Sequence, residues 1–88
     1  MYKIISTKLF EKKLSKLDKN VSKKIILGLF RLEKSVSNVE ELQYTPKDLN
    51  GLCKYKIGDY RVLLWVDEIR KEVILYSVAH GKDIYRFI

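Results

Sequence analysis

The chain has 88 residues, 47% of them hydrophobic, and a formal net charge of +7 at pH 7. This length and apolar fraction exclude wholesale disorder and predict one domain, residues 1–88, with a modest core. The single cysteine, Cys53, and the single histidine exclude an internal disulfide and the common zinc ligand sets. No apolar segment is long enough to span a bilayer and no signal peptide is visible, so we expect a cytoplasmic protein with no metal, cofactor or membrane partner.

The first 36 residues predict a strand followed by two helices. Residues 2–6 form a short β-type run, and Ser6 or Thr7 can cap the helix that follows. Apolar side chains recur at helical spacing in residues 7–18, and they step by three and four in residues 21–36, which is the strongest helical pattern of the chain. The short connection predicts that these helices form an antiparallel hairpin.

Two residues of the second predicted helix have particular roles. Asn20 is placed to cap its start. Gly28 lies in its interior, where glycine costs about 1 kcal/mol relative to alanine, so it indicates close packing against a neighbouring element.

All of the excess positive charge lies at one end of the chain. Residues 1–34 carry ten Lys or Arg and three Asp or Glu, whereas residues 35–88 carry eight of each. A one-sided basic surface favours a polyanionic partner, either a nucleic acid or an acidic protein. Lysine is also a good helix former on solvated faces, and charge alone does not separate the two interpretations.

The second half of the chain predicts an irregular connection and then three strands. Residues 37–52 show no clear period, and we expect a connection there with one turn of helix around residues 39–42. The hydrophobic period then changes from 3.6 to 2, which predicts strands at 54–57, 60–66 and 72–79. A loop and a short helix complete the chain.

The predicted order is therefore β-α-α-β-β-β. Three consecutive strands with tight turns form an antiparallel sheet, to which residues 2–6 add a strand. The N-terminal αα-hairpin covers one face, and the fold class is α+β. The last strand is apolar on both faces, which indicates a covered position inside the sheet.

A cationic cluster lies at the turn between the first two strands of this sheet. Lys54 and Lys56 alternate with apolar residues, so a strand places both on one face, and Arg61 follows the Gly58-Asp59 turn. Cleavage of RNA by its own 2′-hydroxyl needs a base, an acid and cations, and it needs no metal. Arginine clamps phosphate oxygens, and a lysine crowded by other cations can act as a base. Alternatively, the two lysines only protect an edge strand from aggregation.

Two motifs resemble those of the RelE/ParE toxin superfamily. One is Leu-Asn-Gly-Leu at residues 49–52, followed by a basic strand and Gly-Asp-Tyr-Arg-Val at residues 58–62. The other is Val-Ala-His-Gly-Lys-Asp-Ile-Tyr-Arg at residues 78–86, which is similar to the family's C-terminal Val-Gly-His-Arg-x-x-Val-Tyr. The predicted order of elements is also that of the family, and the resemblance spans nearly the whole chain.

The resemblance implies particular catalytic residues. RelE-type members use basic residues of the second strand, the arginine after Gly-Asp-Tyr, a second arginine and a C-terminal tyrosine. The matching residues are Lys54, Lys56, Arg61 and Tyr85. Gly81 stands where the second arginine is expected. The auxiliary candidates to replace its charge or assist the reaction are His80, Lys82 and Arg86.

The resemblance also implies a function and partners. We expect a toxin that cleaves mRNA at the ribosomal A site and contacts ribosomal RNA, with a cognate acidic antitoxin of the RelB type. The residues expected to bind RNA or the ribosome are Lys12, Lys13, Lys16 and Lys23. The alternatives are a ParE-like, non-enzymatic inhibitor of DNA gyrase and a catalytically weakened member that mainly binds its antitoxin.

Overall fold

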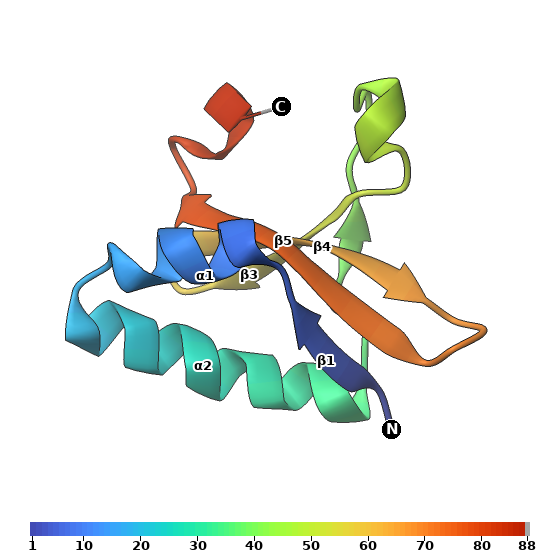
Figure 1. The fold of residues 1–88 in the computed structure, drawn as a ribbon, viewed down its shortest axis with the longest axis horizontal. Coiled ribbons are helices and arrows are strands. Elements are labelled where there is room, and N and C mark those ends of the chain that lie inside the picture. Colours follow the sequence, from blue (N-terminus) through green and yellow to red (C-terminus); the bar gives the residue numbers. More distant parts are fainter. Residues whose placement is uncertain (88) are drawn as a thin grey trace.

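The computed structural model describes residues 1–87, apart from the side chains of Tyr85 and Phe87. In chain order its elements are β1 (Lys3–Ser6), α1 (Lys8–Ser15), α2 (Lys19–Lys34), β2 (Glu40–Glu41), the 3₁₀ helix η1 (Lys47–Leu49), β3 (Cys53–Ile57), β4 (Tyr60–Asp67), β5 (Glu72–His80) and the 3₁₀ helix η2 (Ile84–Phe87). Figure 1 shows two helices against a twisted sheet, which confirms the α+β class and the expected order.

The sheet is mixed rather than wholly antiparallel. The strand order is β1-β5-β4-β3-β2. The three pairs from β2 to β5 are antiparallel, whereas β1 pairs in parallel with β5, with Ile4 opposite Val73. β5 lies between β1 and β4, in agreement with its apolar residues on both faces.

The helical hairpin begins at a side-chain cap. Thr7 precedes α1, and its Oγ1 accepts a hydrogen bond from the Phe10 N–H at 3.2 Å. The same hydroxyl donates to the Leu75 carbonyl at 2.8 Å, which attaches the start of α1 to β5. This confirms Thr7 as a cap and places α1 on the sheet.

The connection between the helices differs from the prediction. α1 ends at Ser15 rather than at residue 18, because the backbone tightens to i→i−3 hydrogen bonds, from Lys16 N–H to Lys13 and from Leu17 N–H to Leu14. The cap of α2 is Asp18, so Asn20, inside the first turn, is not the cap.

The main core lies between the helices and the sheet. Its members are buried apolar residues of both layers: Phe10, Ile25, Leu29, Leu32, Tyr55, Val62, Leu64, Val73, Leu75 and Val78. A Cβ on Gly28 would stand 2.8 Å from Ile57 Cδ1, so the absence of a side chain lets α2 approach β3. This confirms the close packing expected at Gly28.

A second apolar cluster covers the other face of the sheet. It consists of Leu49, Leu52, Leu63, Ala79 and Ile84. In Figure 1 the η1 segment and the C-terminal segment rise from the sheet on the side away from α2. Both segments contribute to this cluster, which anchors them to the sheet.

The prediction of a helical turn around residues 39–42 is wrong. Glu40 and Glu41 form the short strand β2, paired with Lys54 and Cys53 of β3. The prediction failed because a strand of two residues has no period of its own, and cross-strand pairing determines its conformation.

Candidate functional site

The β3–β4 hairpin brings the three predicted cations to one place. Gly58 has φ of +58°, a left-handed conformation that glycine adopts without steric cost, and it turns the chain after β3. In the resulting register Lys56 lies directly opposite Arg61. Directly opposed residues project from the same face of a sheet, so Lys54, Lys56 and Arg61 share one face.

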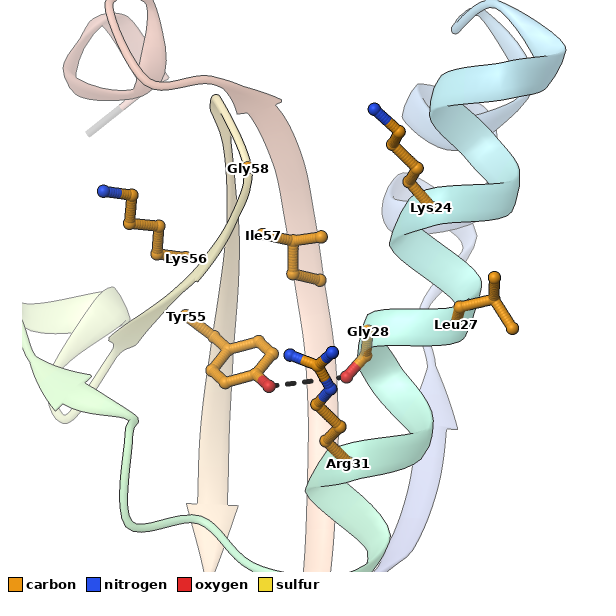
Figure 2. A pocket seen from close by; sticks show the side chains of 8 residues that line it. All are labelled: Lys24, Leu27, Gly28, Arg31, Tyr55, Lys56, Ile57 and Gly58. Carbon is orange, nitrogen blue, oxygen red and sulfur yellow. Dashed lines mark hydrogen bonds between the residues drawn. The ribbon is translucent and has the colours of Figure 1, made fainter.

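This face is the one that the helices leave open. Figure 2 shows Tyr55 and Ile57 directed toward α2, whereas Lys56 points away from it. Lys54, Lys56 and Arg61 line a hollow of about 170 Å³ together with Asn38 and Glu40. The hollow is therefore a concave surface with three cations and one carboxylate.

Glu40 is the member of this hollow that sequence reasoning missed. Its Oε2 lies 3.8 Å from Lys54 Nζ, with the two side chains 73% and 32% exposed. An ion pair with this exposure contributes less than about 1 kcal/mol to stability. Glu40 faces Lys54 because β2 pairs with β3, and the only signal in the sequence was its charge in a segment that was predicted as a helical turn.

Arg61 is held by the turn that precedes it. Its Nη1 donates to the Tyr60 carbonyl at 3.0 Å and to the Gly58 carbonyl at 3.3 Å. The remaining guanidinium nitrogens, Nε and Nη2, donate no hydrogen bond within the described residues and are open to an anion. Arg61 is thus partly oriented while donors stay available.

Gly81 lies beside Arg61, where the resemblance expected a second arginine. A Cβ built on Gly81 would be 3.3 Å from both Arg61 Cζ and the Asp59 carbonyl oxygen. The Gly81 N–H also donates to that carbonyl at 2.8 Å. Its φ is outside the left-handed region, so a side chain here meets crowding but no backbone strain.

The three auxiliary candidates do not line the hollow. His80 pairs with Tyr60, and the two rings meet edge to face at 5.3 Å, on the helix side of the sheet where Tyr60 packs against the main core. Lys82 is exposed in the turn after β5. Arg86 is exposed and forms an ion pair with Asp83 at 3.9 Å. The side chain of Tyr85 lies outside the described residues.

The lysines expected to bind RNA lie in the helical layer. Lys12 and Lys13 belong to α1, Lys16 follows it, and Lys23 belongs to α2. All except the half-buried Lys13 are exposed. None of these four lysines lines the hollow, although Lys56 of the hollow also lines a groove with Lys24 and Arg31 of α2.

Cys53 is not equipped as a nucleophile. Burial raises the pKa of its thiol, and the nearby Glu41 carboxylate raises this pKa further. The Sγ lies 3.3 Å from the Gly51 carbonyl, to which the thiol donates. A protonated thiol is a poor nucleophile, so Cys53 has a structural role.

Within residues 1–87, no three or more His, Cys, Asp and Glu side chains are grouped as a metal site requires. No helix of the described chain has the length and hydropathy needed to cross a membrane.

The family of the chain follows from comparison of its sequence with protein-family models. Residues 4–85 match the ParE toxin of the type II toxin–antitoxin system parDE. The chain therefore belongs to this family of the RelE/ParE superfamily, and the protein is a type II toxin. The curated proteins gave no significant match.

Solved structures share the fold. The RelBE2 toxin–antitoxin complex from Mycobacterium tuberculosis matches with a TM-score of 0.77 and 22% identity, over 90% of this chain and 96% of that one. The archaeal RelE–RelB complex from Pyrococcus horikoshii OT3 matches with a TM-score of 0.73 and 23% identity, over 91% and 94%. The isolated E. coli RelE toxin matches with a TM-score of 0.71 and 18% identity, over 100% of both chains.

Proposed function

We propose that this toxin is a ribosome-dependent endoribonuclease that cleaves mRNA without a metal ion and thereby inhibits translation. The observation that carries the proposal is the hollow in which Lys54, Lys56 and Arg61 meet on the open face of the sheet. Three cations around one concave surface suit a phosphodiester that gains negative charge during reaction.

The reaction proposed for this hollow is attack by the substrate's own 2′-hydroxyl. The 2′-oxygen forms a bond to phosphorus as the bond to the 5′-oxygen breaks, which leaves a 2′,3′-cyclic phosphate and a 5′-hydroxyl. Lys54 or Lys56 takes the 2′-hydroxyl proton or stabilises the developing charge, and water gives a proton to the leaving 5′-oxygen. Arg61 presents Nε and Nη2 to the phosphate oxygens.

Tyr85 and the helical lysines have supporting roles in this proposal. Tyr85 follows β5 by five residues, and we assign it to orienting or stacking on the substrate. Lys12, Lys13, Lys16 and Lys23 contact ribosomal RNA through phosphates, which carry no sequence information. An acidic antitoxin of the RelB type inhibits the toxin by binding it, because the similar structures include complexes of RelE with RelB.

A second function is supported by two specific observations. The matching family is that of the ParE toxin, and Gly81 occupies the position of the missing arginine. On this alternative the protein inhibits DNA gyrase without catalysis. The remaining alternative is a catalytically weakened family member that mainly binds its antitoxin. The only observation that supports it is Gly81 at the position of the missing arginine.

One pair of assays separates these functions. The purified toxin is added to a reconstituted translation system, and cuts in the translated mRNA are mapped by primer extension. The same preparation is tested for inhibition of gyrase supercoiling. Cuts that require translation support the proposal. Inhibition of supercoiling without cuts would replace it with the ParE-like function, and neither activity would favour the antitoxin-binding member.

A further inference from the structure

A second hollow adjoins the cationic hollow at the edge of the sheet, and we call it the edge hollow. Its volume is about 280 Å³, and it is lined by Glu40, Glu41, Leu42, Gln43 and Lys54. Glu40 and Lys54 also line the cationic hollow, so the two hollows share a wall. An RNA strand whose scissile phosphate lies among the cations therefore has a place beside it for a neighbouring nucleotide.

The two hollows differ in charge. The cationic hollow has three cations and one carboxylate, whereas the edge hollow has two carboxylates and one cation. Carboxylates repel a phosphate, but they accept hydrogen bonds from N–H groups, and the edges of nucleobases carry such donors. The edge hollow is therefore suited to a base and not to the RNA backbone.

The wall of the edge hollow is anchored to the rest of the fold. The Leu42 N–H donates to the Leu52 carbonyl at 2.9 Å, and the Leu42 side chain packs against the second apolar cluster. Further along the connection, Leu49 is buried in that cluster, and the Trp65 indole N–H donates to the Asn50 carbonyl at 3.2 Å. A site held in this way loses little conformational freedom when a ligand binds.

An aromatic side chain stands at the rim of the edge hollow. Tyr44 directly follows Gln43, and its side chain is 98% exposed. Its φ of +61° is a left-handed conformation, which is uncommon for a residue other than glycine. Unstacked bases of single-stranded RNA stack on aromatic rings of this kind.

We propose that the edge hollow binds one nucleobase next to the scissile phosphate, and that this base is guanine. The Watson–Crick edge of guanine places two donors, N1–H and N2–H, side by side, where they match the two oxygens of one carboxylate. Adenine, cytosine and uracil each offer only one donor on this edge. The inference rests on the proposed cleavage, because it takes the phosphate to lie in the cationic hollow.

Three side chains read and hold the base. Glu40 supplies the carboxylate because it lines both hollows, and its Oε2, 3.8 Å from Lys54 Nζ, is too far away for a hydrogen bond with that lysine. The Gln43 amide donates to the guanine O6. Tyr44 stacks on the base and contributes affinity without selecting among bases.

Binding is tested by NMR titration of the toxin with trinucleotides of 2′-O-methyl RNA, which cannot be cleaved because the attacking hydroxyl is blocked. The central base is varied between two uracils. The guanine probe should shift the amide signals of residues 40–44 and bind about 10-fold more tightly than the adenine probe. Hypoxanthine lacks the 2-amino group of guanine, so its probe should bind with intermediate affinity.

Variants separate reading of the base from stacking. Glu40→Gln should reduce the preference for guanine over adenine about 10-fold, because an amide offers one acceptor and one donor, which match N6–H and N1 of adenine. Tyr44→Ala should weaken binding of every probe about 10-fold, and Tyr44→Phe should bind like the parent. The controls, in the β4–β5 turn, are Glu68→Gln and Ile69→Ala, the latter at a residue 96% exposed, and both should bind like the parent.

Cleavage of translated mRNA by the same proteins is mapped by primer extension, with guanine or adenine at each position of the codon that is cut. The parent should cut faster beside guanine, and Glu40→Gln should reduce that preference. No binding of any probe, equal affinity for all bases, or an equal loss for guanine and adenine in Glu40→Gln would overturn the inference, even if mRNA is cut. Guanine-selective binding by a parent that cuts nothing would support the base site and refute the proposed cleavage.

Discussion

The Arg61 guanidinium rests against Gly81, and no side chain at residue 81 separates it from the turn carbonyls that hold it. Gly81→Arg places a second guanidinium beside the first, and its backbone allows the change because φ is outside the left-handed region. We expect faster cleavage of translated mRNA, measured by primer extension. Gly81→Ala, which crowds Arg61 equally at Cβ, is the control. A faster cleavage rate in both variants would show that displacement of Arg61, and not the added charge, causes the increase.

Arg61→Ala tests the proposed chemistry directly. If Arg61 meets the charge that develops on the phosphate, its loss should reduce the cleavage rate by roughly 10²–10³. Arg70→Ala removes the same charge from the exposed turn between β4 and β5 and should leave the rate unchanged. The rate is measured at saturating toxin with both variants confirmed as folded. Equal rates for the two variants would remove Arg61 from the mechanism.

The helical lysines should determine how strongly salt weakens ribosome binding. Replacing Lys12, Lys13, Lys16 and Lys23 with Gln should reduce the slope of log affinity against log salt by roughly 3, because each phosphate contact contributes a little under one. A control variant with Gln at Lys3, Lys34, Lys47 and Arg70 loses the same charge elsewhere. Identical slopes for both variants would mean that only the net charge of the toxin attracts the ribosome.

Gly28 should be intolerant of even one methyl group. Alanine gains about 1 kcal/mol in helix propensity, but its Cβ would stand 2.8 to 3.1 Å from three Ile57 atoms. Overpacking of this kind costs about 1–3 kcal/mol, so we expect a net loss of about 1 kcal/mol in the free energy of unfolding. Urea denaturation measures this loss of stability. The control is Leu27→Ala, one residue away and exposed, which should change the free energy of unfolding by less than about 0.5 kcal/mol. Unchanged stability in Gly28→Ala would show that α2 can move away from β3.

Cys53 should react slowly with alkylating reagents. Its pKa is raised, so a smaller fraction is thiolate at pH 8 than in the unfolded chain, and the side chain is half-buried. We expect iodoacetamide to modify it about tenfold more slowly than in urea, as followed by mass spectrometry. The difference in modification rate between the native and the unfolded protein should narrow as the pH rises above 9, because the native thiol then ionises too. Equal rates at pH 8 would contradict the burial of this thiol.

Elements in which apolar residues recur at a regular spacing could be predicted from the sequence. The two helices and the strands β3, β4 and β5 each have enough residues for an apolar pattern to repeat, and the pattern placed Lys54 and Lys56 on one face. The antiparallel register that opposes Lys56 to Arg61 then follows from the two-residue turn at Gly58.

Features that depend on tertiary pairing could not be predicted. β2 is too short for a period, so Glu40 did not enter the predicted site. The register of β4 and β5 shifts between Leu63 and Leu64, so that His80 lies opposite Tyr60 on the helix side of the sheet and not on the face of Arg61. The parallel direction of β1 follows from how the hairpin crosses the sheet, and a strand of four residues contains no information about direction.

The pairing of Lys3 with Glu72 has a consequence for synthesis of the toxin. Among the described elements β1 is made first, whereas β5, its partner in the described sheet, is the last strand to be made. The β1–β5 pair joins segments that are far apart in the sequence, and such contacts are slow to form. Until β5 is made, the apolar face of α2 lacks part of the sheet on which it packs, and transiently exposed apolar surface of this kind favours aggregation. Formation of the folded toxin therefore depends on β5, the last strand of the described sheet in chain order.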